Sequence, residues 1–373
     1  MFPFVAGENF ETSNVRNLLL ASGVEVSEAL CLGIGGGIAA GYQFCPSVPN
    51  YGTLLGSGVQ MIPRVKMMTT NGAWYRDTFE RLGVAVDVRE STGKKGALAN
   101  LRAGVDAGKL VVAWTTPLGL AQTANWTATC GMYTVLVHGI DGDTVEYSDH
   151  VSVRKAGLEE FSAARERVCS LKNRTMTVAV GKKLDWTGAV KAGLRETAGD
   201  FVKPKLGTFN LPGLKEGVGL LNGVKNKRAW PVVFPGAKVL LPMRDLYESI
   251  ELGTGGGLMR PMYAAFLEEA AVLLKADGLR EVAVQYRELG KEWTAFAEFI
   301  LPKPFADIKK AMRKLAAGDQ TQREILTALH ERPFPWDGGK IGVFLDEASA
   351  RLGALYDRES AVARDLTEVV GKL

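Results

Sequence analysis

The sequence is poor in the residues from which metal and thiol sites are built. It has three histidines and four cysteines among 373 residues. Structural zinc sites need closely spaced pairs of cysteine and histidine, and no Cys-x-x-Cys pair occurs in the chain. We therefore expect no metal and no other cofactor. The cysteines, which we expect to be reduced and mostly buried, are Cys31, Cys45, Cys130 and Cys169.

Long charged runs and long apolar runs are also missing. The formal net charge is +4 at pH 7, and it is spread along the chain without a block of Lys or Arg. This pattern argues against binding to nucleic acid or to a membrane surface. No window approaches the ~20 apolar residues of a membrane-spanning helix, and the N-terminus lacks the regions of a signal peptide. We expect a cytoplasmic protein.

The rest of the composition is ordinary. Hydrophobic residues make up 46% and charged residues 23% of the chain, as in typical globular proteins. A chain of this length can form two domains that each bury a core. Prolines interrupt residues 181–245, and helical patterns follow. We therefore expect a first domain over residues 1–180, an inter-domain region over residues 181–245 and a helical domain over residues 246–373.

The segment around which the chain is organised lies near the N-terminus. Apolar residues at helical spacing predict a first helix that ends at Gly23, with Thr12 or Ser13 as its cap. A second helix begins at Ser27 and Glu28. A glycine run follows this second helix: Gly33, Gly35, Gly36 and Gly37.

Two helix-glycine-strand units come next, and they predict helices packed on one sheet. Helical spacing over residues 72–82 and 97–107 is followed each time by a glycine and a strand. The clearest hairpin joins residues 132–138 to residues 145–148. Further expected elements are strands near residues 59–68 and 176–180 and helices over residues 157–168, 281–300, 305–317, 321–331 and 341–370.

The N-terminal segment resembles the butirosin biosynthesis protein H N-terminal domain, a family of acyl-transferring enzymes in bacterial natural-product pathways. In that family His-Cys-Glu-Thr opens the first helix, and Ser-Glu and Gly-Leu-Gly-Gly-Gly follow. The resemblance implies an α+β fold, with a papain-like, cysteine-peptidase-type N-terminal domain before a mainly α-helical C-terminal domain. The residues that carry it are Glu11, Thr12, Arg16, Asn17, Leu18, Leu19, Ser27, Glu28, the glycine run and Tyr42.

The second half of the chain resembles the helical domain that usually accompanies this family and has no separately assigned function. The resemblance rests on the glycines at 255–257, on Arg260 and on Trp293. A glycine-rich turn before a helix can hold an anion, but this one lacks the residues of a phosphate-binding loop. We expect it to be structural.

The reactive pair of the family is replaced in this chain. Asn9 and Phe10 stand where the family has histidine and cysteine, and a phenylalanine cannot attack a thioester. On the hairpin, the position of the family's catalytic histidine falls on or near Tyr133, whereas the family's aspartate is retained as Asp149. We therefore expect the covalent route of the family to be lost.

Other residues could replace the lost pair only by a change of position. His138 is on the opposite strand face from Tyr133, and His150 follows the strand end, so neither replaces the base without a register shift. Candidates for a relocated thiol are Cys31, Cys45 and Cys130.

Groups that transfer protons without a covalent intermediate remain. We expect Glu11, Tyr133 and Asp149 to be catalytic, because a buried carboxylate beside an apolar ring can act as a general acid or base. The structural alternative is that Glu11 caps or salt-bridges its helix and that Asp149 bonds a backbone turn. The residues that we expect to bind substrate are Asn9, Phe10, Thr12, Gly35, Gly36 and Tyr42.

Three functions follow from this pattern. The first is an enzyme that promotes a cyclisation, condensation or amide formation on an acyl, aminoacyl or peptidyl-type substrate without a covalent intermediate. The second is a non-catalytic partner of a carrier protein or of an active homologue, in which Phe10 and Tyr133 fill the pocket. The third is a thiol acyltransferase with a relocated cysteine. The expected partners are a small or carrier-bound substrate, a carrier protein and a second copy of the chain.

Overall fold

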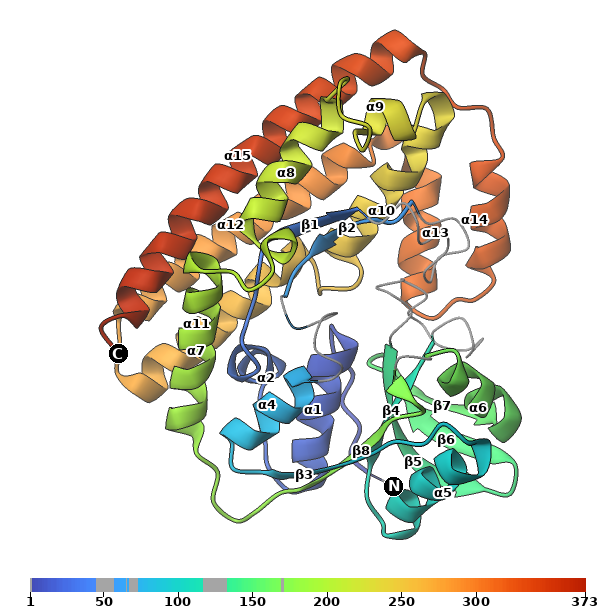
Figure 1. Ribbon diagram of the computed structural model, residues 1–373, viewed down its shortest axis with the longest axis vertical. Coiled ribbons are helices and arrows are strands. Elements are labelled where there is room, and N and C mark those ends of the chain that lie inside the picture. Colours follow the sequence, from blue (N-terminus) through green and yellow to red (C-terminus); the bar gives the residue numbers. More distant parts are fainter. Residues whose placement is uncertain (1, 45–56, 65, 67–72, 117–132, 169–170) are drawn as a thin grey trace.

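The computed structural model describes residues 2–44, 57–64, 66, 73–116, 133–168 and 171–373. The fold is α+β, with a six-stranded antiparallel sheet in the N-terminal part and helices in the C-terminal part. Figure 1 shows the sheet and the first helices at one end and the long helices at the other. The expected α+β class is thus confirmed, and a papain-like arrangement stays a prediction.

The large sheet has the strand order β3-β8-β4-β5-β6-β7, with every neighbouring pair antiparallel. The expected hairpin is confirmed as two neighbouring strands next to the edge strand β7, and its register pairs Leu136 with Ser148. An irregularity between Val137 and Gly139 falls on the first strand of this hairpin. The strands are β3 (Ala85–Arg89), β4 (Val111–Thr115), β5 (Tyr133–Asp141), β6 (Thr144–Ser148), β7 (Val153–Gly157) and β8 (Thr175–Ala179).

Side chains on the two faces of this sheet enter two different hydrophobic cores, because successive residues of a strand point to opposite faces. Leu136 and Trp114 belong to the larger core, which contains residues from both ends of the chain. Tyr133 and Val135 belong to a smaller core with residues of three helices, among them Phe10. The helices beside the sheet are α4 (Ala73–Arg81), α5 (Lys94–Asp106) and α6 (Leu158–Glu166).

The first two helices are α1 (Phe10–Ala21) and α2 (Glu28–Ile34). Ser27 caps α2, as expected, by accepting a hydrogen bond from Leu30 N. The expected cap of α1 at Thr12 or Ser13 is wrong. The helix begins earlier, because Asn9 has an extended backbone and its side-chain oxygen accepts hydrogen bonds from the N–H groups of Glu11 and Thr12.

A second, two-stranded sheet lies among the helices of the C-terminal part (Figure 1). It pairs β1 (Gly41–Phe44) with β2 (Val59–Ile62), and it contacts α8 and α10. The sequence pattern predicted a strand near β2 but none at β1. An N-terminal segment therefore contributes strands to the helical part of the molecule.

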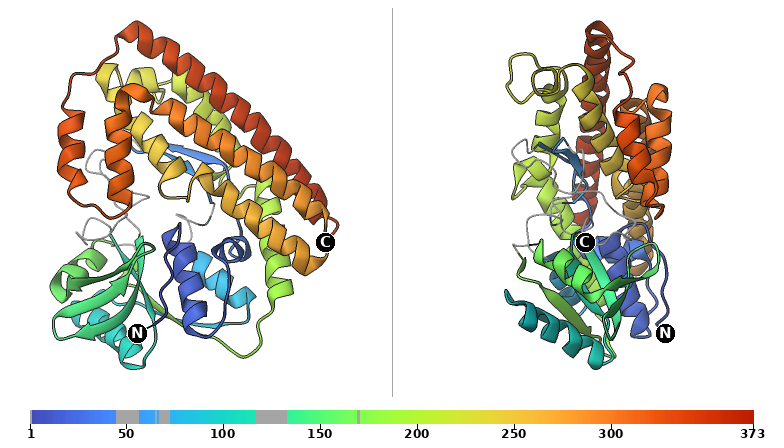
Figure 2. Two further views of the ribbon diagram at one scale, coloured as in Figure 1. Left: turned by 180° about the vertical axis from the view of Figure 1, so that it is seen from behind. Right: turned by 90° about the vertical axis from the view of Figure 1, so that its right-hand side faces the viewer.

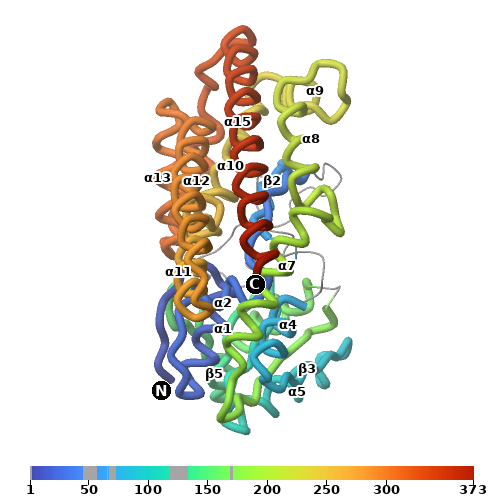
Figure 3. Tube along the Cα trace, turned by 90° about the vertical axis from the view of Figure 1, so that its left-hand side faces the viewer, coloured from blue at the N-terminus to red at the C-terminus, as the bar shows by residue number. Residues whose placement is uncertain are grey.

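Long helices form the other half of the structure (Figures 2 and 3). α15 packs on α8 and α12, and α11 packs on both α12 and α2. The helices expected after residue 281 are confirmed. The bounds are α10 (Leu240–Glu251), α11 (Arg260–Leu274), α12 (Gly278–Ile300), α13 (Ala306–Ala316), α14 (Gln322–His330), α15 (Gly338–Val370), η5 (Gly257–Met259) and η6 (Lys303–Phe305).

Residues 181–245, expected as an inter-domain region, are mostly helical. Pro212 and Pro231 lie in the first turns of their helices, where the missing N–H costs nothing. α7 contacts α2 and α15, and α8 contacts β1. The division at residues 180 and 245 stays a prediction. The bounds are α7 (Trp186–Val202), η3 (Gly207–Phe209), α8 (Leu211–Asn222), α9 (Trp230–Val233) and η4 (Gly236–Val239).

Among the described helices, none combines the length and the apolar character that crossing a bilayer requires.

The contact between α7 and α2 gives a stability prediction. A Cβ at Gly193 would lie 2.1 Å from the carbonyl oxygen of Gly33, so Gly193→Ala should lower the free energy of unfolding by about 1–3 kcal/mol through overpacking. Gly199 lies on the same helix with no atom within 4 Å of such a Cβ. Gly199→Ala should therefore raise the free energy of unfolding by up to ~1 kcal/mol. Urea denaturation measures both, and equal shifts would contradict the packing.

Candidate functional site

The two positions at which the family resemblance led us to expect a reactive pair lie in contact in the structure. Phe10 is the first residue of α1 and Tyr133 is the first residue of β5. Their ring centroids lie 4.7 Å apart, and the exposed fractions of the two residues are 6% and 1%. The two rings therefore form a buried aromatic contact between α1 and β5.

The Tyr133 hydroxyl lies 3.1 Å from the Nδ1 atom of His150. Burial and nearby Asp149 raise the pKa of Tyr133 well above its usual value, and burial lowers the pKa of His150. At neutral pH the phenol is thus protonated and the imidazole is uncharged, so the hydroxyl can donate to Nδ1. Together they form a buried hydrogen-bonded pair of a proton donor and a proton acceptor.

From the sequence we expected that His150 could replace the base only through a register shift, but the structure brings its ring to Tyr133 without one. After β6 the chain folds back in a short turn, in which Asp149 N donates to the Ser152 carbonyl at 3.1 Å. The His150 carbonyl then accepts a hydrogen bond from Gly7 N at 2.7 Å. A turn, rather than a register shift, brings the imidazole to Tyr133.

His138 points elsewhere, as expected. Its ring contacts Phe2 at a centroid distance of 5.0 Å, and its Nδ1 atom lies 4.0 Å from Glu146 Oε2. It therefore takes no part in the contact between Phe10 and Tyr133.

Asp149 organises the turn that carries His150. Its fully buried carboxylate accepts hydrogen bonds at 2.8 Å from the backbone N–H groups of Val151 and Ser152, and it pairs with Arg154 Nε at 2.7 Å. The carboxylate thus reaches His150 through the backbone. These contacts give Asp149 a positioning role.

Glu11 is paired with an arginine that the sequence analysis missed. Its carboxylate bonds the Nη2 atom of Arg64, whose guanidinium carbon lies 4.7 Å from the ring centroid of Trp74 on α4. Arg64 is 1% exposed, and burial lowers its pKa to about 10. The available signal was a single arginine shortly after a short strand, and no local pattern distinguishes such a residue.

The Ser27-Glu28 pair, which resembled a family motif, builds the turn before α1. Glu28 accepts hydrogen bonds from the N–H groups of Glu8 and Asn9 and from the Thr12 hydroxyl at 2.6 Å. The Ser27 hydroxyl donates to Glu269 of α11 at 2.7 Å. The pair therefore sets the start of α1 and ties it to the helical half.

Asn9 and Thr12, two of the expected substrate-binding residues, use their side chains in these structural contacts. Asn9 caps α1 through its oxygen, and its Nδ2 atom donates to the Gly253 carbonyl at 3.0 Å. The Thr12 hydroxyl is held by Glu28.

Three further expected substrate-binding residues make close packing contacts. A Cβ at Gly35 would lie 2.1 Å from Trp74 Nε1, and one at Gly36 would lie 2.4 Å from a Glu196 oxygen. The Tyr42 hydroxyl accepts a hydrogen bond from Trp230 Nε1 at 2.9 Å. The glycines allow α4 and α7 to approach α2, and Tyr42 lies in the helical half.

Cys31 is a poor candidate for a relocated nucleophile. It is buried in α2, and burial, together with the nearby Glu28, raises the pKa of its thiol far above the usual range. The thiolate, which is the reactive form, is therefore disfavoured. Cys45, Cys130 and Cys169 lie outside the described residues, within which no three His, Cys, Asp or Glu side chains could hold a metal ion.

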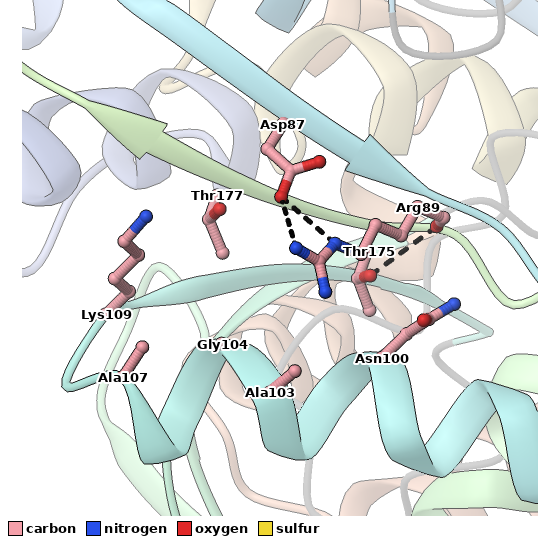
Figure 4. Close-up of a pocket in the computed structure, with 9 residues that line it drawn as sticks. All are labelled: Asp87, Arg89, Asn100, Ala103, Gly104, Ala107, Lys109, Thr175 and Thr177. Atoms are coloured by element: carbon pink, nitrogen blue, oxygen red, sulfur yellow. Dashed lines mark hydrogen bonds and ion pairs between the residues drawn. The ribbon is translucent and has the colours of Figure 1, made fainter.

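A shallow cavity of about 100 Å³ lies beside α5, between that helix and strands β3 and β8 (Figure 4). Its best-placed charged group, Arg89, donates to Asp87 at 3.0 Å. Strand β4 separates β8 from β5 and Tyr133 in the sheet. The cavity is therefore distinct from the candidate site.

The contacts of Glu28 predict a loss of stability on neutralisation. Glu28→Gln keeps the shape of the side chain, but only one oxygen can then accept hydrogen bonds where the carboxylate has two. We therefore expect the free energy of unfolding to fall by about 1–3 kcal/mol. Glu25, exposed three residues earlier, provides the control Glu25→Gln, which should change it by less than ~0.5 kcal/mol. Denaturation midpoints measure both, and a neutral Glu28→Gln would show that the turn does not depend on this carboxylate.

The buried imidazole predicts a dependence of stability on pH. Burial lowers the pKa of His150 from 6.5, an effect that Arg154 adds to and that Asp149 and Glu28 oppose. Below pH 6.5 the unfolded chain binds a proton that the folded chain does not, so stability falls with falling pH until the folded-state pKa is reached. His150→Asn should reduce this slope when unfolding is measured across that window. An unchanged slope would contradict a buried neutral imidazole.

Comparison with known families matches two consecutive stretches of the chain. Residues 9–150 match the family described as butirosin biosynthesis protein H, N-terminal, and this stretch runs from the cap of α1 to His150. Residues 156–326 match a domain of unknown function, DUF4872, which here includes α6 and β8. No curated protein matches the chain. The chain therefore contains a stretch that is similar to the N-terminal domain of butirosin biosynthesis protein H, followed by a stretch that is similar to DUF4872.

Proposed function

We propose that this protein is a natural-product biosynthesis enzyme that acts on an acyl, aminoacyl or peptidyl-type substrate by noncovalent acid–base catalysis. The family is associated with acyltransferase-like chemistry in biosynthesis, which supports the substrate class. The reaction is a cyclisation, condensation or amide formation on an already activated substrate. The substrate arrives free or on a carrier protein, in the cytoplasm.

The observation that carries this proposal is the hydrogen bond between Tyr133 and His150 beside Phe10. Phe10 removes the nucleophile from the start of α1, and the covalent route requires one. The pair next to it keeps a proton donor and a proton acceptor 3.1 Å apart. General acid–base catalysis requires such a pair of groups, and it does not require a covalent intermediate.

Each expected catalytic residue then has a separate role. Tyr133 donates or accepts the proton at the reacting group, and His150 holds the proton that Tyr133 exchanges. Asp149 positions His150 through the turn. Glu11 contributes through its pair with Arg64, which holds one charge of each sign at the start of α1.

The contact between Phe10 and Tyr133 also favours a second function, a non-catalytic partner of a carrier protein or of an active homologue. The two rings pack against each other and are almost completely buried. This is the filled pocket that such a partner would have. We prefer the enzymatic function to the binding partner for one reason. Two rings could fill a pocket without the buried hydrogen bond between the Tyr133 phenol and the His150 imidazole.

We test the proposal with Tyr133→Phe, His150→Asn and Glu11→Gln in a reconstituted pathway that needs this protein. Tyr133→Phe keeps the ring contact and removes only the hydroxyl, so a loss of about a hundredfold in kcat is expected if the phenol transfers the proton. His150→Asn should cost a similar factor, and Glu11→Gln should lower activity as well.

Two controls separate the alternatives. Alkylation of the wild type with iodoacetamide should leave activity intact. A loss of activity after alkylation would instead support a thiol acyltransferase with a relocated cysteine. Asp149→Asn should reduce activity together with stability, because it loosens the turn. Full activity in Tyr133→Phe and His150→Asn would instead identify a binding partner.

A further inference from the structure

The cavity beside α5 arises because this helix packs on inner strands of the large sheet and leaves the edge strand uncovered. α5 contacts β4, β5 and β8, and a Cβ at Gly104 would lie 2.5 Å from Val111 Cγ2 of β4. β3 is the edge strand beyond β8. Toward β3 the helix presents Ala103 and Ala107, whose methyl groups do not fill the gap. A space of about 100 Å³ therefore stays open between α5 and β3 (Figure 4).

Arg89 turns one edge of its guanidinium into this cavity. Arg89 and Asp87 are two residues apart on β3, so their side chains point to the same face of the strand. The Nε and Nη2 atoms of Arg89 lie 3.0 and 2.9 Å from Asp87 Oδ2. The other edge, formed by Nη1 and Nη2, has no partner among the described residues, and Figure 4 shows it turned toward α5. Arg89 therefore presents a fork of N–H groups to the cavity.

Lys109 borders the same cavity at the end of α5. Its backbone N–H donates to the Gly104 carbonyl at 3.1 Å, which fixes the residue there. Its ammonium group and the hydroxyl of Thr177, on β8, make no hydrogen bond within the part of the chain that the structure describes. Asp87 is the one carboxylate that the described residues contribute to the lining, and Arg89 neutralises it. The lining therefore offers free donors and an excess of one positive charge.

The size and the donors of the cavity select the ligand. Pockets that hold whole small molecules measure about 300–1,000 Å³, so this space accommodates one chemical group, with the rest of a ligand outside. An arginine fork suits two oxygens of one anion. A carboxylate then has no third oxygen for Lys109 or Thr177. A phosphate group has one, and it matches the donors better.

We propose that the cavity between α5 and β3 binds a phosphate group, carried either by inorganic phosphate or by a small phosphate monoester. The Nη1 and Nη2 atoms of Arg89 bind two of its oxygens, and Lys109 and Thr177 bind a third. Asp87 keeps the guanidinium oriented. The site lies apart from Tyr133 and His150, so it stands or falls independently of the proposed function.

Nuclear magnetic resonance of the full chain with ¹³C-labelled threonine methyl groups tests this site. The Thr177 resonance is assigned by its loss in Thr177→Ser. Inorganic phosphate, methyl phosphate and acetate are titrated separately, with chloride keeping the ionic strength constant. We expect a saturable shift of the Thr177 methyl group with one or both phosphate probes, and the tighter of the two identifies the source. No saturable shift with either, or an equal affinity for acetate, would overturn the proposal.

Substitutions at exposed positions test the two cations. Arg89→Lys keeps the charge but lacks the fork, and Lys109→Ala removes the ammonium group. Each should weaken the affinity for the tighter phosphate probe by about tenfold, the loss expected for one charge-assisted hydrogen bond. Lys95→Ala is the matched control, because Lys95 is exposed on the same helix and outside the cavity lining. It should leave the affinity unchanged. An equal affinity in all variants, or an equal loss in Lys95→Ala, would contradict a defined site.

Discussion

The geometry of the site depends on the hydrogen bonds that the Glu28 carboxylate accepts. Glu28 belongs to α2, but its carboxylate accepts hydrogen bonds from Glu8, Asn9 and Thr12, all at the start of α1. Asn9 then caps α1, so the helix begins at Phe10. Buried carboxylates are costly unless several donors satisfy them, and the chain meets this need with the backbone of one turn. The position of Phe10 against Tyr133 follows from that turn.

The two stretches that match known families, residues 9–150 and 156–326, pack together around the start of α1. Ser27 bonds Glu269 of α11, and Arg260 of α11 donates to the Ala39 carbonyl at 2.8 Å while pairing with buried Glu359 of α15. The larger hydrophobic core contains residues from Val15 to Val370, and β8 completes a sheet whose other strands lie before residue 158. The DUF4872 stretch thus supports the N-terminal domain directly. The glycine run serves this packing, since its members leave room for α4, α7 and α11.

Local patterns predicted the elements well because amphipathic spacing and hairpin turns are properties of neighbouring residues. They predicted the hairpin, the N-terminal cap of α2 and the long C-terminal helices. They missed β1, whose partner β2 is a separate segment of the chain. They also missed Arg64, because its partner Glu11 is far away in the sequence. His150 was missed for the same reason, because a turn held by Asp149 decides where it points. The family resemblance identified positions 10 and 133, but only tertiary structure shows what surrounds them.

The central claim is that Phe10 and Tyr133 occupy the two positions of a thiol and imidazole pair. Restoring that pair with Phe10→Cys and Tyr133→His, and measuring the rate of iodoacetamide alkylation of the new thiol against pH, tests this without any knowledge of the substrate. An imidazole in contact should lower the thiol pKa below the ~8.5 of an ordinary cysteine, whereas Phe10→Cys alone should show no such lowering. The account predicts a clear difference between the two variants. Identical pH profiles would show that the positions do not form a reactive pair and would contradict it.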